Sequence, residues 1–437
     1  MPETDAPGHD HHPSPDDDAI PAPRAHLALA STRPLRSPAF RWFFAGWSVT
    51  RAGSAMSPVA LAFGVLEVTD SATWLSAVLT SAMIPMIATT ILGGGIADRY
   101  RRDTVLRLTS LGSGVSQSGV AVVLLTHQHP ALLLPLSACN GVFQGLTTPT
   151  LRGIVPQLAG GRGIQQANSL LATARNATRL VGPSAAGLLT VSVGGGWAIA
   201  ADAASFFLAA LCFARMALPE MPARAKGGPT MLGELRQGWR YFSSRPWIWS
   251  VTLAFAVLNA VTMGVWNILG PVIAVDTIGP GGWGLVLSVR GAGALLAAMA
   301  MVKLTVRRPM TPALLSMTLA GVPLILLGVR ADTLWLASAA FAAGVASEFF
   351  TVVWSTLWHL HIPERLSSRV GAYDEFGSFV SIPVGQLSVP PLAAAFGTGV
   401  VAVTGGVVVV AAMLLPLLLP SLRRIEISTS EATDGPS

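Results

Sequence analysis

Long apolar runs alternate with short polar breaks along almost the whole chain. Each run holds about 20 residues, enough for a helix to cross the hydrocarbon of a bilayer, and each ends at glycine, proline or charge. The runs of the first half cover roughly residues 40–66, 73–97, 104–126, 130–150, 166–190 and 196–216. Those of the second half cover roughly residues 247–274, 282–303, 311–329, 333–358, 370–395 and 398–420. The pattern predicts an all-α integral membrane protein with twelve transmembrane helices.

The two halves of the chain repeat one another. Pro38 before the first run corresponds to Pro246 before the seventh, and Pro183 in the fifth run corresponds to Pro391 in the eleventh. The separation is 208 residues in both pairs. The repeat predicts two pseudo-symmetric six-helix bundles, an arrangement typical of transporters whose path lies between the bundles.

The breaks divide the chain into five predicted segments. These are a disordered cytoplasmic tail at 1–36, an N-terminal six-helix bundle at 37–216, a cytoplasmic linker at 217–245, a C-terminal six-helix bundle at 246–421 and a cytoplasmic tail at 422–437. The first tail is polar and acidic, and its histidines are not expected to bind a metal. In the linker, the stretch MLGELRQGWRYFSS gathers its apolar residues on one helical face, which favours a helix lying on the membrane surface.

Basic residues predict the orientation. All but five of the 28 lysines and arginines lie on the side of the two termini; the exceptions are Arg51, Arg175, Arg179, Arg290 and Arg330. Because basic loops stay in the cytoplasm, we expect both termini there, in a plasma (inner) membrane. No basic stretch followed by an apolar one opens the chain, so we expect the first run to be a true span. Scarce lysine and abundant alanine are typical of a bacterial, GC-rich genome.

Composition excludes several classes of protein. Only 11% of the residues are charged and 51% are hydrophobic, whereas a soluble domain carries about 25% charged residues. The net charge of +6 is spread between apolar runs, so no nucleic-acid partner is expected. Cys139 and Cys212 lie inside apolar runs and predict neither a disulfide nor a metal site. No nucleotide-binding loop, hydrolase elbow or zinc-protease motif occurs, so we expect neither an enzyme nor a cofactor.

Charge is concentrated between the second and third runs. The stretch from Gly94 to Arg102, GGIADRYRR, resembles the G-x-L-a-D-R-x-x-R-[RK] signature of the major facilitator superfamily. It departs from the signature at Arg101, where a glycine is usual, and at Asp103, where a base is usual. The resemblance implies a conformational latch formed by Asp98 with Arg99 and Arg102 against the start of the eleventh run, near 369–374.

Further stretches resemble one branch of that superfamily. LRSPAFRWFFAGWSVTRAGSAM, LRGIVPQLAGGRGIQQANSL and RVGAYDEFGSFVSIPVGQL are similar to drug:proton antiporters, in the branch that includes macrolide-efflux proteins and the enterobactin exporter. Gly182, Pro183 and Gly187 lie in a stretch similar to the antiporter motif G-P-x-x-G-G, with Ala186 in place of a glycine, and small residues there permit close helix packing. The resemblance implies a secondary transporter that exports an amphipathic or lipophilic molecule in exchange for protons. An importer or facilitator of a small, anionic metabolite is the alternative.

Ionisable residues inside predicted spans mark functional positions, because charge in hydrocarbon is unfavourable. A carboxyl group that alternates between protonated and ion-paired forms can couple transport to protons. Glu348, past the middle of the tenth run, is the first candidate, followed by Asp374, Glu375 and Asp202.

Static roles remain open for the same acids. A fixed pair of Glu348 with Arg290 would explain both residues equally well. An Arg179–Asp202 pair across the fifth and sixth runs is expected as structural neutralisation. Asp374 lies about one turn from the predicted inner surface, where a gate or a helix cap is expected.

The substrate cavity is expected to be wide and apolar, with few fixed polar contacts. Because Arg51 and Arg290 are positively charged, an anionic substrate remains an alternative. Further candidates for the wall are Trp47, Met56, Phe63, Asn140, Gln144, Asn259, Met263, Trp266, Asn267 and Trp354. The expected partners are a small-molecule substrate, protons and lipid, with a monomer as the working unit.

Overall fold

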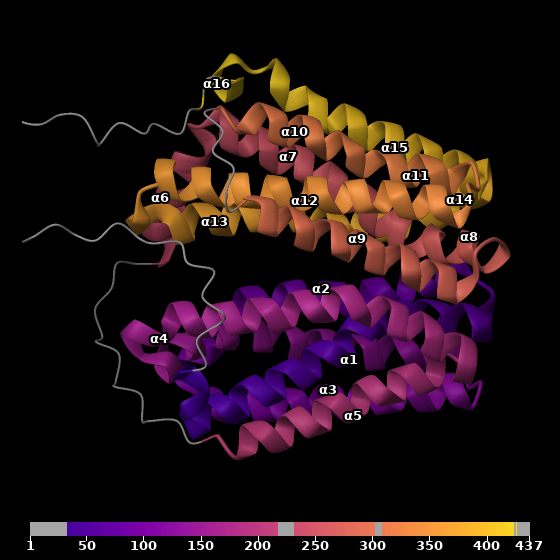
Figure 1. Cartoon of the computed structure of the whole chain (residues 1–437), viewed down its shortest axis with the longest axis horizontal. Coiled ribbons are helices and arrows are strands. Elements are labelled where there is room, and N and C mark those ends of the chain that lie inside the picture. The colour runs from indigo at the N-terminus through magenta and orange to yellow at the C-terminus, as the bar shows by residue number, and fades with distance from the viewer. Residues whose placement is uncertain (1–32, 217–230, 302–307, 424, 426–437) are drawn as a thin grey trace, which may run out of the picture.

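The computed structural model describes residues 33–216, 231–301, 308–423 and 425, and within its helices it leaves undescribed the side chains of 91–99, 152, 153, 156, 159–162, 231–235, 364, 365, 368, 421 and 423. Two groups of helices lie side by side (Figure 1). The first group contains α1 (Pro38–Thr69), α2 (Ala72–Arg99), α3 (Arg102–Leu125), α4 (Leu133–Val193) and α5 (Gly195–Ala214), with short turns η2 (Arg33–Arg36) and η3 (Pro130–Leu132). The predicted first tail therefore ends in a 3₁₀ turn, and the rest of it lies outside the described residues.

The second group follows the helix α6 (Met231–Ser243). Several of its spans are interrupted by a turn of another helical type. Its elements are α7 (Pro246–Val261), η4 (Thr262–Leu269), α8 (Gly270–Asp276), α9 (Gly279–Met301), α10 (Met310–Met317), η5 (Thr318–Gly321), α11 (Val322–Gly328), α12 (Thr333–His361), α13 (Glu364–Phe379), α14 (Ser381–Phe396), α15 (Thr398–Leu414), η6 (Leu415–Leu418) and α16 (Pro420–Arg423).

Ten segments of the described chain are long and apolar enough to cross a membrane. They correspond to all the predicted spans except the fourth and fifth, which both fall on α4. The first arm of α4 packs Gly141 against the Ala82 carbonyl of α2, and the second packs Gly182 against Ala55 of α1. Gly194 just after α4 lies near Glu67, and His129 just before α4 contacts Trp74, so both ends of α4 lie at one end of the molecule. The 61-residue helix must therefore reverse direction between its arms.

The two ends of the molecule are distinguished by their turns. One end, which we call the distal end, carries the turns at Asp70, Gly194 and Asp276. A pocket lined by Glu67, Asp70, Asp276 and their neighbours lies there. The opposite end, which we call the terminal end, carries α6 and α16 (Figure 1).

The repeat seen in the sequence reappears in the backbone. Pro38 and Pro246 both stand in the first turn of a helix, where the missing proline N–H removes no intrahelical bond. Gly194 and Gly397 connect equivalent spans with nearly the same dihedrals, φ 89° and ψ 157° against φ 88° and ψ 146°. Only glycine adopts that region without strain, so both halves use the same turn.

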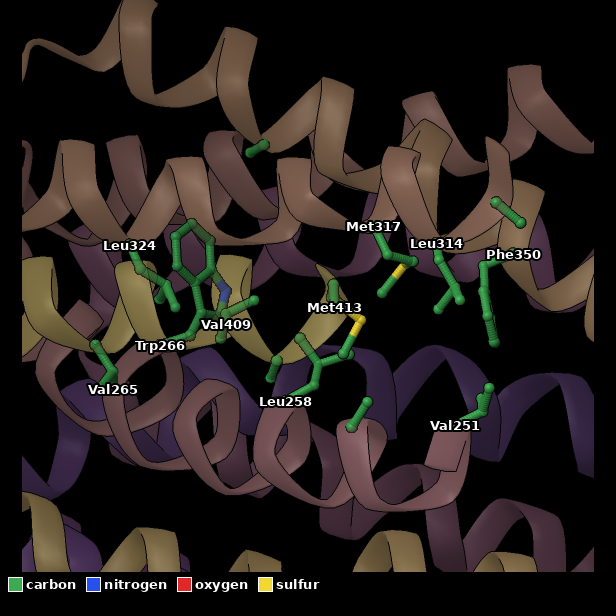
Figure 2. Close-up of a cluster of buried hydrophobic side chains, with 14 of the residues drawn as sticks. Val251, Leu258, Val265, Trp266, Leu314, Met317, Leu324, Phe350, Val409 and Met413 are labelled. Carbon is green, nitrogen blue, oxygen red and sulfur yellow. The ribbon is translucent and has the colours of Figure 1, made fainter. Parts of the chain in front are cut away.

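A core of apolar side chains holds the second group together. Val251, Leu258 and Trp266 point from the first span of the group toward Leu314, Met317 and Leu324 of α10 and α11 and toward Val409 and Met413 of α15 (Figure 2). Trp266 is 3% exposed and stacks on Trp283, with ring centres 4.6 Å apart.

The amphipathic helix expected in the linker forms, and it packs on protein. Gly238 of α6 approaches Arg369 of α13, and Arg369 donates a hydrogen bond to the Gln237 side chain at 2.5 Å. Trp239 stacks against Phe242 and lies 5.3 Å from the Tyr373 ring. Residues 217–230 of the linker lie outside the described chain, so the part that can be followed belongs to the second group.

Replacing Gly397 by alanine should destabilise the protein. Nothing lies within 4 Å of a Cβ built there, so the penalty comes from the backbone alone and amounts to about 1–3 kcal/mol. Thermal unfolding of the purified protein in detergent measures it. Gly281→Ala, whose new methyl group would meet only Val191 at 3.7 Å, is the control and should change little. Equal unfolding midpoints for the two variants would contradict the assignment.

Candidate transport site

The two groups of helices meet tightly in their distal halves. Ser184 of α4 donates hydrogen bonds from its backbone N–H and its hydroxyl to the Ser288 hydroxyl of α9, at 3.0 and 2.8 Å. A Cβ at Gly187 would lie 2.6 Å from the Pro280 carbonyl oxygen, and one at Gly284 would clash with the Pro183 carbonyl. The stretch expected to serve helix packing therefore joins the two halves.

A second junction links α2 with α14. The Ser76 hydroxyl donates to the Gln386 carbonyl at 2.6 Å, and the Thr80 hydroxyl donates to the Gln386 side chain at 3.2 Å. Ser76 and Thr80 are in the first turns of α2, which begins at the distal end. The sequence shows only that these stretches are rich in small residues, since no local pattern reveals a partner more than 300 residues away.

Three arginines lie in the middle of the first group. The Arg51 guanidinium stands 5.5 Å from the centre of the Trp47 ring, and the charges of Arg175 and Arg179 act on it from the second arm of α4. All three side chains are exposed, and among the described residues none of them forms an ion pair. Arg51 and Gln144 also line a cavity of about 80 Å³.

Asp202 is buried in a different part of the same group. Its side chain is fully enclosed, and it accepts hydrogen bonds from Gln117 at 3.1 Å and from Ser205 at 3.5 Å. Ser54 and Ser57 of α1 are also within hydrogen-bonding reach. The expected Arg179–Asp202 pair is wrong, because α5 turns Asp202 toward α1 and α3 while Arg179 faces Arg51.

The candidate acids of the second group lie on two helices, with Asp374 and Glu375 adjacent on α13 and Glu348 on α12. Asp374 accepts a hydrogen bond from the Thr252 hydroxyl at 2.6 Å, which ties α13 to α7, and Glu375 is exposed. Glu348 of α12 is half-buried. Among the described residues no ion pair joins Glu348 to Arg290, whose guanidinium instead lies 5.9 Å from the centre of the Trp266 ring. The static Glu348–Arg290 pair is therefore absent from this conformation.

Several residues expected on the cavity wall have structural contacts. Trp266 belongs to the core of the second group, and Asn259 donates to the Ser378 carbonyl at 2.9 Å. Phe63 is also buried, at 4% exposure, and Met56 packs beside it. Asn267 contacts the Met263 sulfur. Trp266 lies in the core, whereas Phe63 also lines the pocket beside Glu67 and Asp70 at the distal end, and the role of Asn259 stays a prediction.

Other candidates remain near open space. Asn140 keeps a buried side-chain oxygen that no described group bonds. Trp354 is half-buried in a row of rings with Phe350 and Trp358, whose centres lie 6.0 and 5.8 Å away.

The charged loop between α2 and α3 is described in part. The side chains of Gly94, Asp98 and Arg99 lie outside the described ones, and Arg102 opens α3. Asp103 pairs with Arg101 at 2.9 Å and accepts the Thr104 N–H at 2.9 Å. It lies in the first turn of α3, where a negative charge is more favourable than a positive one. α2 packs on α14, and α13 is not among the helices substantially packed against it in the described chain. The latch itself remains a prediction.

The fold is that of a multi-pass transporter. Two crystal structures share it. The nucleoside transporter NupG has a TM-score of 0.72 at 12% identity, over 86% of this chain and 98% of that chain. A POT family transporter in complex with a thioalcohol-conjugated peptide has a TM-score of 0.68 at 12% identity, over 86% of this chain and 95% of that chain. The chain belongs to the transmembrane secretion effector family of the major facilitator superfamily, whose family model matches residues 29–432. Its substrate is therefore a small molecule, and its family consists of transporters and not enzymes.

Two curated relatives match almost the whole chain. The multidrug efflux pump Tap of Mycobacterium tuberculosis (strain ATCC 25618 / H37Rv) is 24% identical over 92% of this chain and 98% of its own length. The enterobactin exporter EntS of Citrobacter koseri is 25% identical over 91% of this chain and 95% of its own length.

Proposed function

We propose that this protein is a bacterial inner-membrane exporter that expels an amphipathic small molecule in exchange for protons and works as a monomer. The observation that carries the proposal is that two relatives named as efflux proteins match it over more than nine-tenths of its length. Efflux by a secondary transporter follows from that kinship, and the importer alternative is not favoured.

Alternating access supplies the mechanism. The described hydrogen bonds between the two groups, from Ser184 to Ser288 and from Ser76 and Thr80 to Gln386, lie in their distal halves, as does the approach of Gly187 to Pro280. One further close approach, of Gly291 to the Arg179 carbonyl, lies near the middle of α9. With the termini in the cytoplasm, as the basic residues indicate, the distal end is the outer end and this conformation is closed outward. In the reverse state, Asp98, Arg99 and Arg102 would form the latch at the inner end, and the distal contacts would separate.

Glu348 is the proposed proton carrier. It sits within a span, and no described cation holds it in a fixed pair. Asp374 is engaged by Thr252, which suits a gate linking α13 to α7, and Asp202 is enclosed by hydrogen-bond partners. A carboxyl group with fewer fixed partners can gain and lose a proton with less rearrangement, which favours Glu348 over Asp374 and Asp202. Glu375, which is exposed, is the remaining candidate.

Expression of this protein in a bacterial host that lacks its own efflux pumps should raise the resistance of the host to some members of a panel of toxic amphiphiles. A proton uncoupler should abolish the effect, because the gradient would be the only energy source. Increased accumulation of a compound in cells with an intact gradient would contradict export.

Glu348→Gln should remove the dependence of transport on external pH, because an amide cannot release a proton, while ligand binding to the purified protein persists. Transport into proteoliposomes with an imposed pH gradient measures the effect, and we expect a loss of at least tenfold in gradient-driven rate. Glu67→Gln, at the distal end, is the control. A wild-type pH profile in Glu348→Gln would remove that residue from the mechanism.

Cysteines at 184 and 288, in a chain whose Cys139 and Cys212 are replaced by serine, should form a disulfide, because the two native hydroxyl oxygens are 2.8 Å apart. The bond would hold the distal halves together and stop transport, and a reductant should restore it. Each single cysteine variant serves as control. Full transport by the cross-linked protein would show that these contacts need not open.

A further inference from the structure

The charge of the first group is unbalanced near its centre. Arg175 and Arg179 are one helical turn apart on α4, and both act electrostatically on Arg51 of α1. Three positive groups thus repel one another within spans, where positive charge is already unfavourable. Such a cluster is stable only if water or an anion compensates it.

No acid of the described protein compensates it. Asp202, on the adjacent α5, is bonded by Gln117 and Ser205 and forms no ion pair with these arginines. On α3, the described charged residues Arg102, Asp103 and Arg107 lie in its first two turns, at the terminal end. The second-group helix packed on this arm of α4 is α9, and its ionisable residue there, Arg290, is also positive. Because the three side chains are exposed, water or a bound anion supplies the compensation.

A pocket beside Arg51 has the chemistry and size for an anionic group. Its lining includes Arg51, Ser54, Gln144 and Thr147, which can donate hydrogen bonds, together with the aromatic rings of Trp47 and Phe213. Its volume of about 80 Å³ is enough for a few water molecules. A carboxylate or sulfonate group fits such a volume, whereas a drug-sized body does not.

We infer that Arg51, Arg175 and Arg179 form an anion-binding site and that the cargo is an amphipathic anion, whose acidic group binds in the Arg51 pocket while its apolar body stays outside. The inference rests on the proposed export function and names the class of its cargo. Arginine suits the role because its planar guanidinium binds carboxylate or sulfonate oxygens in pairs and remains charged.

Two probes with one aromatic body and opposite charge test the inference: naphthalene-2-sulfonate and naphthalen-2-ylmethylammonium. Isothermal titration of the full-length protein in detergent measures their affinities. The wild type should bind the sulfonate at least tenfold more tightly than the ammonium compound. Arg51→Gln, Arg175→Gln and Arg179→Gln should each weaken sulfonate binding at least threefold, and lysine at the same positions should retain most of it.

Arg107→Gln is the matched control, because Arg107 is an exposed arginine of α3 outside the cluster. Its sulfonate affinity should equal that of the wild type. Gel filtration and thermal unfolding establish that each variant is folded, and the lysine variants keep the test valid if a glutamine variant is not. Equal or tighter binding of the ammonium compound, or unchanged sulfonate affinity in all three glutamine variants, would overturn the inference.

The binding experiment and the export assay test different proposals, and each can fail without the other. Uncoupler-sensitive efflux of cationic compounds without anion preference would keep the export function and reject the anion site. Anion binding without uncoupler-sensitive efflux in cells would keep the site and reject proton-driven export.

Discussion

Unfavourable charge in hydrocarbon is the constraint on which the internal arrangement of this protein depends. Each ionisable group within the spans must find compensation, and the structure uses three forms of it. Asp202 is enclosed by hydrogen-bond donors from α3 and α5, Asp374 by the Thr252 hydroxyl, and Arg290 by the face of Trp266. Arg51 has a tryptophan ring, exposure and two positive neighbours but no acidic partner among the described residues, so the positive cluster is where a bound anion can contribute most.

The two groups of helices are joined where their backbones approach one another closely. Glycine and serine at the contacts of α4 with α9 let carbonyl oxygens and hydroxyls meet without intervening side chains. These contacts consist of a small number of hydrogen bonds and close backbone approaches, with a few apolar side chains such as Val59 and Phe63 packed beside them. They can therefore separate and re-form at modest cost, which is what a junction that opens in each cycle requires.

The sequence predicted the fold more completely than the site. Apolar run length located ten spans that the structure describes, and the proline repeat anticipated matching helix starts at Pro38 and Pro246. The fourth and fifth spans could not be separated by helix boundaries, because α4 runs through both. The Gly182 stretch was expected to pack helices, and it does so across the two halves.

Side-chain partners were harder to foresee for a physical reason. Spans that are apolar around their whole circumference carry little information on which face points inward, so the rotation of each helix stays open until all are packed. Asp202 consequently meets Gln117 and not Arg179, and Trp266 lies in a core and not on a wall. Arg175 and Arg179, by contrast, share a face whatever the packing, because i and i+4 positions coincide on any helix.

The sign of the Arg51 cluster also decides how membrane voltage acts on transport. The cytoplasmic face of a plasma membrane is held negative, so an anion moving outward gains about 2.3 kcal/mol per unit charge at 100 mV. A proton moving inward gains the same amount. An exchanger that carries one anion out for one proton in is therefore electrogenic, and voltage alone can drive it when the two compartments have equal pH. A pump whose cargo is a monovalent cation would transfer no net charge in the same exchange, so three arginines would convert a proton-driven device into a voltage-driven one.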